Sequence, residues 1–208
     1  MTMRKIAEST VRRLSLYLRC LEGFEAQGLE TVSSDVLAAR GGTTSAQVRK
    51  DLSFFGSFGK RGLGYSVREL SSALRGILGL GRRYRVAVIG AGKIGSALVQ
   101  YPGFRQRGFD IVAIFDADTR KVGEAWDGLR VRHVRELDQA LRDQPADIVA
   151  IVTPGEVAQG MVDRCVALGV KAILNFAPVQ LQVPDDVAVK HVNLALEFET
   201  LTFALNNR

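Results

Sequence analysis

The chain has 208 residues, of which 47% are hydrophobic and 24% charged, and its 28 Lys+Arg against 22 Asp+Glu give a formal net charge of +6. This composition is typical of a folded globular protein of one or two domains and excludes wholesale disorder. No apolar run approaches the roughly 20 residues of a membrane helix, the polar start does not resemble a signal peptide, and two cysteines are too few for a disulfide framework. We therefore expect a protein of the reducing cytoplasm.

The excess positive charge lies in the first two-fifths of the chain. Residues 1–85 hold 15 Lys+Arg and 7 Asp+Glu, a balance of +8, whereas residues 86–208 hold 13 and 15, a balance of −2. This asymmetry favours a polyanion-binding module joined to a module of another kind. A solvated basic surface is the alternative, and charge alone does not separate the two.

Two helices are predicted at the start of the chain. An apolar stripe at helical spacing predicts a first helix over residues 9–27. Its members are Val11, Leu14, Leu18 and Leu21. Ser33 or Ser34 caps a short second helix, which the glycine pair 41–42 ends.

A third helix has the pattern of a DNA-recognition helix. Thr44 and Gln47 form a capping-box pair at its head, and it runs to about residue 55. One face is apolar, whereas the outer face is small, polar and basic and can donate to base edges and phosphates. The pattern alone is common among pairs of helices. The residues that we expect to contact DNA here are Thr44, Ser45, Ala46, Gln47, Arg49, Lys50 and Ser53.

The segment 56–65 supports this interpretation. It is rich in glycine, has aromatic residues near both ends and places Lys60 and Arg61 at its centre. We interpret it as a β-hairpin with a basic tip, the wing of a winged helix, whose cations enter a narrow minor groove. A flexible surface loop is the alternative. Ser66 and Glu69 then form a second capping box, which opens a helix that ends at residues 79–81.

The second half of the chain opens with a dinucleotide-binding pattern. The apolar strand 85–89 leads directly into a G-x-G-x-x-G loop, and a helix follows, as this fingerprint requires. The glycines permit a tight turn, a close approach of pyrophosphate and the packing of helix on strand. The helix N-terminus then supplies amides to the phosphates. The expected ligands of this loop are Gly90, Ala91, Gly92, Lys93, Ile94 and Gly95.

Asp116 marks the expected ribose contact. It ends a second strand, 111–115, and lies 21 residues after Gly95, where a carboxylate accepts hydrogen bonds from the ribose hydroxyls and repels a 2′-phosphate. This favours NAD over NADP, although Arg120 and Lys121 lie nearby. A strand-end turn residue is the alternative role of Asp116.

Strands and helices alternate through the rest of the chain. Strands are expected at about 130–133, 147–152, 171–174 and 187–192, with a helix over 156–167, which indicates a doubly wound parallel sheet. The terminal helix is apolar on more than one side, so we expect it to bury against a partner subunit. The alternative is that it packs on its own domain.

No catalytic or metal-binding constellation is visible in the sequence. His133 and His191 adjoin strands, and neither Cys20 nor Cys165 has a recognisable base or metal partner. The expected cofactor is therefore a sensed ligand rather than a reagent. Two alternatives are a small NAD-dependent oxidoreductase with a basic N-terminal oligomerisation arm and a CoA-binding module on a similar sheet.

Nearly the whole chain resembles the Rex family of redox-sensing transcriptional repressors. The resemblance is carried by QVRKDLSFFG at 47–56, GKRGLGY at 59–65, the glycine loop 90–95, YPGF at 101–104, the turn 116–118 with KVG at 121–123, and NFAP at 175–178. In combination these motifs are highly specific.

The resemblance implies a two-domain α/β homodimer. Its parts would be a winged helix-turn-helix domain over 1–81, a Rossmann domain with a doubly wound parallel sheet over 82–190, and an exchanged C-terminal dimerisation helix over 191–208. Such proteins bind palindromic operator DNA, NADH releases the DNA, and NAD+ competes for the same site. By position, the family's further cofactor-site residues are Tyr101, Lys121, Thr153, Pro154, Asn175, Phe176, Pro178 and Asn193.

Three positions depart from the family pattern. Phe54 stands where the family usually has Tyr, the motif 152–154 reads Val-Thr-Pro in place of Thr-Val-Pro, and Asn193 stands where Asp is frequent as the partner of Tyr101. A neutral amide weakens a charge-assisted bond to the tyrosine. We expect the fold and ligand to persist and the NADH response to be retuned.

Overall fold

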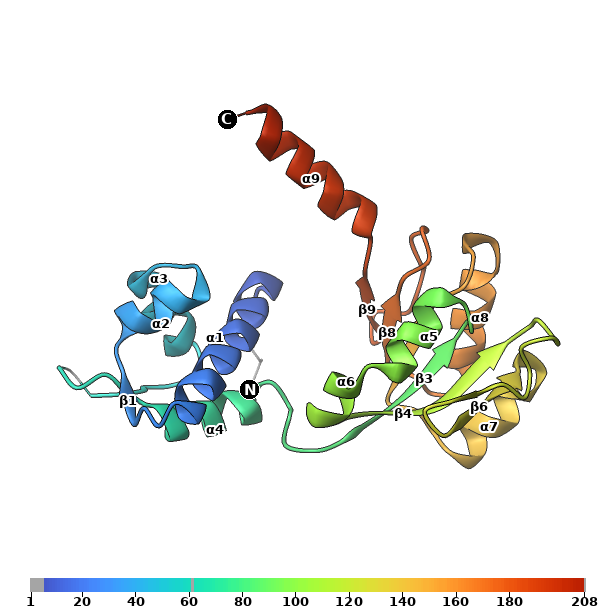
Figure 1. Ribbon diagram of the computed structural model, residues 1–208, viewed down its shortest axis with the longest axis horizontal. Helices are drawn as coiled ribbons and strands as arrows, with labels where there is room; N and C mark the ends of the chain where they lie inside the picture. Colours follow the sequence, from blue (N-terminus) through green and yellow to red (C-terminus); the bar gives the residue numbers. More distant parts are fainter. Residues whose placement is uncertain (1–5, 61, 208) are drawn as a thin grey trace. The chain divides into compact units, whose positions relative to one another are not determined.

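The computed structural model describes residues 6–60 and 62–207, and the chain divides into two compact units between Arg82 and Arg83. The first unit is helical, with one short antiparallel pair of strands (Figure 1). Its elements are α1 (Glu8–Ala26), β1 (Thr31–Val32), α2 (Ser34–Gly41), α3 (Ser45–Ser53), β2 (Tyr65–Ser66) and α4 (Val67–Ile77).

Side-chain caps fix where these helices begin, as predicted. Ser33 Oγ accepts from the N–H of Val36, Thr44 Oγ1 from that of Gln47, and Ser66 Oγ from that of Glu69. The reciprocal halves of the two predicted capping boxes, at Gln47 and at Glu69, are wrong for the described residues. The Gln47 side-chain Nε2 instead donates to Asp51 Oδ1 at 2.8 Å, one helical turn further along α3, and this bond directs the amide away from the N-cap.

The core of the first unit lies between α1 and α4. Leu14, Leu18 and Leu21 of α1 are fully buried in one cluster with leucines of α4, and each contributes about 1.5–3 kcal/mol through burial. Val11, predicted in the same stripe, is 40% exposed, so the buried stripe begins one turn later.

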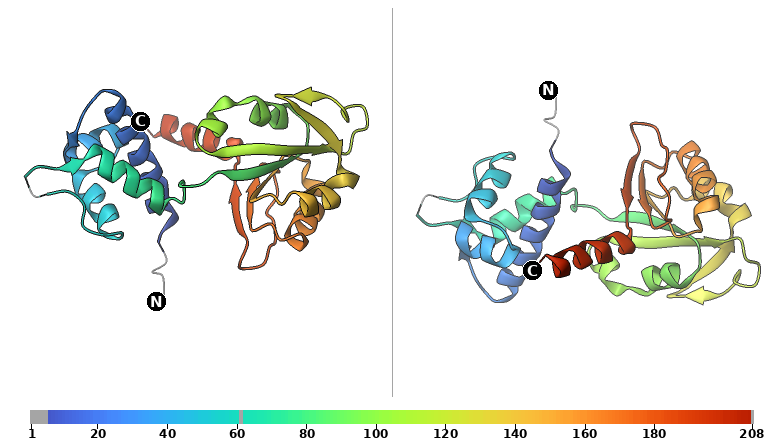
Figure 2. Two further views of the ribbon diagram at one scale, coloured as in Figure 1. Left: turned by 90° about the horizontal axis from the view of Figure 1, so that it is seen from below. Right: turned by 90° about the horizontal axis from the view of Figure 1, so that it is seen from above.

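In the described part of the predicted wing, pairing is limited to one antiparallel bridge rather than two longer strands. A single bridge joins Lys60 to Gly64, and the following strand β2 pairs with β1. Gly59 and Gly64 have φ of +74° and +85°, and a Cβ on Gly59 would lie 2.5 Å from the carbonyl oxygen of Gly64. Gly59 and Gly64 thus lie too close together for side chains, and their positive φ values favour glycine at both positions. The described parts of this segment reach out from the helices (Figure 2).

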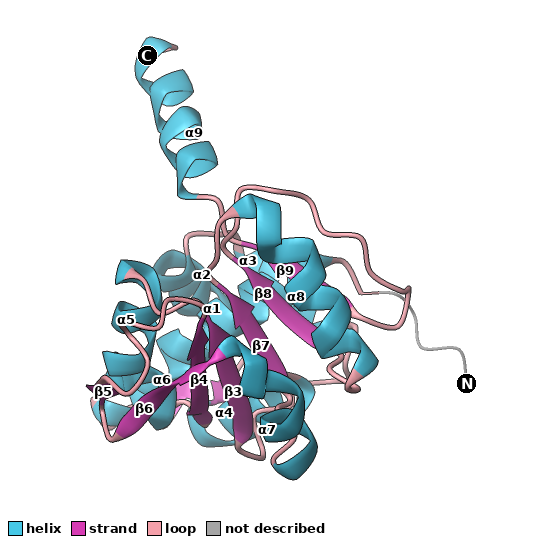
Figure 3. Ribbon diagram, turned by 90° about the vertical axis from the view of Figure 1, so that its right-hand side faces the viewer, coloured by secondary structure: helices cyan, strands magenta, loops and turns pink. Residues whose placement is uncertain are grey.

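The second unit is built on a seven-stranded sheet in the order β5-β6-β4-β3-β7-β8-β9. All pairs are parallel except β5–β6 at one edge. Figure 3 shows this sheet with helices on both of its faces. The strands are β3 (Tyr84–Ile89), β4 (Phe109–Asp116), β5 (Ala125–Trp126), β6 (Leu129–His133), β7 (Ile148–Ile151), β8 (Ala172–Asn175) and β9 (Ala188–His191).

Helices alternate with these strands. They are α5 (Lys93–Gln100), α6 (Pro102–Gln106), α7 (Leu137–Asp143), α8 (Gly155–Ala167) and α9 (Leu194–Asn206), with a short 3₁₀ turn, η1 (Val134–Glu136), before α7. The predicted doubly wound parallel sheet is confirmed. The short elements α6, α7 and β5 were not predicted, because segments of two to seven residues carry little periodicity.

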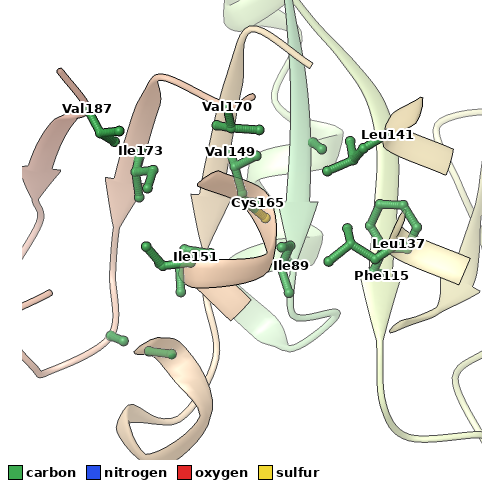
Figure 4. Packing of buried hydrophobic residues seen from close by; sticks show 14 of the residues in the cluster. Ile89, Phe115, Leu137, Leu141, Val149, Ile151, Cys165, Val170, Ile173 and Val187 are labelled. Atoms are coloured by element: carbon green, nitrogen blue, oxygen red, sulfur yellow. The ribbon is translucent and has the colours of Figure 1, made fainter. Parts of the chain in front are cut away.

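Successive residues of each central strand face opposite sides of the sheet. On β3, Ala87 and Ile89 join the larger core cluster, whereas Val88 joins the smaller one. Figure 4 shows the larger cluster, in which Leu137 of α7 and Cys165 of α8 lie over the sheet. Because both faces are covered, the central segments 86–89, 111–115 and 148–151 are apolar throughout, which is why the sequence predicted them well.

The terminal helix α9 does not pack on the sheet of its own unit. None of its residues is buried, and Phe198 and Phe203 are 69% and 71% exposed. Figure 1 shows α9 standing clear of the sheet that it follows. The alternative that this helix covers its own domain is therefore wrong.

Candidate cofactor site and DNA-contact surface

The glycine loop lies where the strand order reverses, at the carboxyl end of β3 between β4 and β7. Gly90 has φ of +112°, and a Cβ there would overlap the carbonyl group of Val152 at the end of β7. A Cβ on Gly95 would overlap the carbonyl oxygen of Gly90, so α5 packs directly on the strand end. Two of the three predicted glycines are thus required by the protein's own packing.

Gly92 differs from the other two. A Cβ on Gly92 would meet no described atom within 4 Å, so the space in front of it belongs to solvent or a ligand. Gly92 is also the N-cap of α5, and no side chain within the described residues caps this helix. The free amides and the positive end of α5 are therefore suited to a phosphate group.

Asp116 bridges the loop and the next strand. Its Oδ2 accepts from the N–H of Ala91 at 2.7 Å and from Lys121 Nζ at 3.1 Å, and its Oδ1 accepts from the N–H of Asp118 at 2.8 Å. Burial raises the pKa of Asp116, but the two backbone N–H groups and the Lys121 ammonium outweigh it, so the pKa lies below its ordinary value. A carboxylate has about four lone-pair positions, so one is left on Oδ1.

The two cations near Asp116 are engaged by carboxylates. Lys121 pairs with Asp116, and the Arg120 guanidinium donates hydrogen bonds to both carboxylate oxygens of Asp118 at 3.0 and 2.8 Å. These hydrogen bonds lower the pKa of Asp118 to about 2. Because each cation already faces a carboxylate, a 2′-phosphate gains little here, which fits the expected preference for NAD.

Thr153 supplies a buried hydroxyl without a partner. Among the described residues, only three buried side-chain polar atoms lack a hydrogen bond, and Thr153 Oγ1 is one of them. It follows Val152, whose carbonyl group a Cβ on Gly90 would overlap. An orphaned hydroxyl beside a glycine loop is the kind of group that a ligand satisfies. The residues present therefore fit a dinucleotide.

Asn175 and Phe176 shape the loop after β8. Asn175 is fully buried, and its Nδ2 lies 2.9 Å from the carbonyl oxygen of Val179 and 3.0 Å from His191 Nδ1, while its Oδ1 accepts from the N–H of Ala177 at 2.9 Å. The Asn175 amide is thus committed to its own loop. Phe176 is half-buried and Pro178 exposed.

The family resemblance implies that Tyr101 of one subunit pairs with Asn193 of the other. Within a single chain, each of the two residues makes its own local contacts. Tyr101 is 58% exposed between α5 and α6, with its ring lying over Gly103 and edge-on to Phe104. Asn193 Oδ1 caps α9 by accepting from Ala195 N–H at 3.0 Å. The capping role of Asn193 was readable from the sequence, because Asn preceding a helix is a preferred N-cap.

The outer face of α3 is open to solvent as predicted. Ala46, Arg49, Lys50 and Ser53 are exposed, as is the capping Thr44. The remaining predicted contacts, Ser45 and Gln47, are half-buried.

Arg49 and the wing border a groove next to α3. The Arg49 guanidinium donates to Ser34 Oγ at 2.7 Å, and the groove of about 480 Å³ is lined by Ser33, Ser34, Arg49, Lys60 and Leu63 among others. Lys60 is exposed, whereas Arg61 lies outside the described residues. Leu63, which the sequence did not single out, is 71% exposed.

A buried ionic cluster under α3 was not predicted from the sequence. Asp51, on the side of α3 turned inward, is 0% exposed and meets Arg13 and Tyr17 of α1. The available signal was the spacing of Thr10, Arg13 and Tyr17, which places three polar groups on one side of α1.

None of the described helices has the length and apolarity needed to span a membrane. Within the same described ranges, no group of three or more His, Cys, Asp or Glu side chains is placed to hold a metal ion.

Two known families match parts of the chain. A family described as "Putative DNA-binding protein N-terminus" matches residues 5–53, and one described as "CoA binding domain" matches residues 82–179. The two matches fall in the helical unit and in the sheet unit, respectively.

Full-length relatives and solved structures are also similar to the chain. The redox-sensing transcriptional repressor Rex of Syntrophomonas wolfei is 48% identical over 210 residues, covering 100% of both chains, and that of Carboxydothermus hydrogenoformans is 48% identical over 96% of each. A crystal structure of RSP in complex with beta-NAD+ and operator DNA has a TM-score of 0.93 at 37% identity, covering 98% of this chain and 94% of that one. RSP in complex with beta-NADH has a TM-score of 0.89 at 35% identity, covering 98% and 95%.

Proposed function

The chain belongs to the Rex family of redox-sensing transcriptional repressors, and we propose that its helical domain binds operator DNA while its Rossmann domain binds NAD+ or NADH. It is a transcriptional repressor and not an enzyme, so the oxidoreductase alternative is set aside. The full-length identity of 48% carries this conclusion. We propose functional boundaries at 1–81, 82–190 and 191–208.

The proposed cofactor site uses the atoms that the protein's own packing leaves free. The amides of residues 92–95, at the N-terminus of α5, hold the pyrophosphate in the space before Gly92. The amides of Gly90 and Ala91 are already bonded within the protein and fix the loop instead. The free lone pair of Asp116 accepts from a ribose hydroxyl, and the unpartnered Thr153 hydroxyl meets the nicotinamide side. Asn175 acts indirectly, by holding the 176–178 loop in place.

The proposed DNA surface is the outer face of α3 with the wing. Arg49, Lys50 and Ser53 are exposed and suited to base edges or phosphates, and Lys60 extends the basic surface. Arg61 completes the proposed set. Gln47 contributes only through the part of its amide that Asp51 leaves free.

Dimerisation through α9 is proposed from its unpartnered apolar surface. Its exposed large side chains are Leu194, Leu196, Phe198, Leu201, Phe203 and Leu205. Burying them against a second copy removes from water an apolar surface that a monomer rarely leaves open. A two-fold dimer then presents two α3 helices to a palindromic operator, with half-sites roughly 34 Å apart.

The proposed switch is a dimer with two states. NAD+ and NADH differ by one positive charge on the nicotinamide ring, so a closed pocket discriminates between them. A ligand shifts the dimer only through its different affinities for the two states. If NADH favours the state whose α3 helices do not match successive major grooves, the operator is released, and NAD+ competes without this effect. Both free cysteines, Cys20 and Cys165, suit the reducing cytoplasm in which we propose that this occurs.

A gel-shift series with a candidate palindrome and varied NADH/NAD+ tests this function. We expect NADH to release the DNA and NAD+ to reverse that release. Retention of the DNA at every ratio would contradict the proposal. In a parallel thermal unfolding experiment, NADH should raise the melting temperature and CoA should not, which separates the CoA-binding alternative.

A further inference from the structure

The recognition helix α3 is tied to α1 by a carboxylate that solvent does not reach. Asp51 is 0% exposed, although it lies on the same helix as the exposed Lys50 and Ser53. A charged side chain is almost never fully buried unless partners compensate it. The partners of Asp51 therefore define what it does.

Donors from two helices converge on the two oxygens of Asp51. Arg13 donates two hydrogen bonds to the carboxylate, from Nε to Oδ2 at 2.6 Å and from a terminal nitrogen to Oδ1 at 2.8 Å. Tyr17 Oη donates to Oδ2 at 3.0 Å and Gln47 Nε2 to Oδ1 at 2.8 Å, with Thr10 Oγ1 3.5 Å from Oδ1. Every lone-pair position of the carboxylate is taken, so no capacity is left for a ligand.

The cluster is a charged one. Burial raises the pKa of Asp51, but hydrogen bonds from Arg13, Gln47 and Tyr17 outweigh it and lower the pKa below its ordinary value. Burial and the hydrogen bond to Asp51 raise the pKa of Tyr17 to about 12, so the phenol remains a donor. An ionised Asp51 can only accept, and this fixes which end of the Gln47 amide faces it.

Stability alone does not account for such a cluster. Replacing a buried ion pair with apolar side chains of similar volume is often neutral or stabilising, because desolvation offsets the attraction. What the directional hydrogen bonds provide is a single relative orientation of α1 and α3. The fork of Arg13 matches the plane of the carboxylate, so it fixes the rotation of α3 about its own axis as well as its distance from α1.

We infer that Asp51 is a positioning residue for sequence recognition, which sets the rotation of α3 against α1 and orients Gln47. This inference rests on the proposed binding of operator DNA by α3. Rotation of α3 decides which side chains reach base edges, whereas phosphate contacts tolerate small rotations. Asp51 therefore governs the preference for operator over random DNA more than the affinity for DNA as such.

Asp51→Asn tests the inference, with Glu30→Gln as its charge-matched control. Both changes remove one negative charge from the helical domain, and Glu30 is exposed, away from the cluster. Electrostatics alone predicts that both variants bind DNA more tightly. The inference predicts that only Asp51→Asn loses preference for the operator, by about tenfold to hundredfold, comparable with a mismatched base pair.

The affinities for random DNA and for NADH serve as controls for folding, because a misfolded domain would change them. We expect Asp51→Asn to match Glu30→Gln in its affinity for random DNA and in the salt dependence of that affinity. Its affinity for NADH should equal that of the unaltered protein. An operator preference equal to that of the unaltered protein would overturn the inference.

Two milder variants decide the question if Asp51→Asn does not fold. Tyr17→Phe removes one donor at nearly constant volume, and Arg13→Lys keeps the charge but removes the fork. Each should lower the operator preference in a folded protein, Arg13→Lys more than Tyr17→Phe. Unchanged preference in both would refute the positioning role.

The outcome for the unaltered protein separates this inference from the proposed function. If the unaltered protein does not prefer the operator, the function proposed for α3 is wrong. If it does and the variants retain that preference, only the positioning role of Asp51 is wrong.

Discussion

Each domain contains one structurally central aspartate, and the two differ in what their surroundings leave free. Asp51 receives side-chain donors from two helices, is fully buried and has every lone-pair position occupied. Asp116 receives two backbone N–H groups and Lys121, and 13% of its side chain remains exposed. Both carboxyl groups have pKa values below the ordinary one, because hydrogen bonds outweigh burial.

The difference distinguishes a carboxylate that organises the protein from one that awaits a ligand. All lone-pair positions of Asp51 already accept hydrogen bonds, so this carboxylate cannot bind a ligand. Its proposed effect on DNA binding therefore acts through the orientation of α3. The free position on Asp116 is available to a ribose hydroxyl. A depressed pKa is common to both and does not tell the two roles apart; the count of satisfied lone pairs does.

The largest expected effect comes from closing the glycine loop. Gly90→Ala places a methyl group against the Val152 carbonyl at a φ of +112°, which strains the turn at the end of β3. We expect a loss of NADH affinity of at least about 100-fold, which corresponds to 2.8 kcal/mol. Calorimetric titration measures it, while gel shifts should show operator binding that no longer responds to NADH.

Gly92→Ala provides the contrast within the same loop. Its Cβ meets no described atom within 4 Å, so the melting temperature should stay unchanged while NADH affinity falls. Unchanged NADH affinity would show that the space before Gly92 does not hold the ligand.

Asp116→Asn tests the available lone pair. The change removes the charge that accepts from Ala91, Lys121 and the proposed ribose, and a charge-assisted hydrogen bond is worth about 1.5–3 kcal/mol. We expect NADH affinity to fall about tenfold by calorimetric titration. Asp118→Asn is the matched control, because the Asp118 side chain pairs with Arg120 and should leave NADH affinity nearly unchanged.

Lys60→Ala tests the DNA side with a smaller effect. Removing one phosphate contact should weaken operator and random DNA alike and lower the salt-dependence slope by about one. Arg68→Ala is the control, since Arg68 is an exposed cation on α4 with only a 4.0 Å approach to Glu25. Equal slopes for Lys60→Ala and the unaltered protein would remove the wing from the DNA surface.

The pH dependence of Asp51 has the smallest effect. Its pKa is lower in the folded than in the unfolded state, so its stabilisation is present above about pH 4 and is lost as the pH falls through the folded value. Acid unfolding followed by circular dichroism should therefore depend less on pH below 4 in Asp51→Asn. Fluorescence of Trp126, in the Rossmann domain, separates the transition of that domain. Identical acid profiles would contradict the assignment.

What the sequence predicted well depends on local chemistry. Ser33, Thr44 and Ser66 cap helices through contacts within three residues, and the glycine loop is recognised because strand, loop and helix are contiguous. The apolar strands were readable because both faces of the sheet are covered.

What the sequence did not predict depends on contacts between distant segments. Asp51 meets Arg13 from 38 positions away, so nothing near it distinguishes it from a solvated charge on a helix. The capping box predicted at Gln47 failed for a local reason, since Asp51, four residues further along α3, accepts from its side-chain amide. Asn175 is bonded to its own loop through Ala177 and Val179, but its further contact with His191 on the neighbouring strand joins distant segments and was not predicted.

The coupling between the two domains is tested most directly by measuring NADH affinity with and without saturating operator DNA. If NADH releases the operator through a two-state dimer, linkage requires that the operator weaken NADH by the same factor by which NADH weakens the operator. We predict these two factors to be equal and greater than one. The same NADH affinity in the presence and absence of operator would contradict the account.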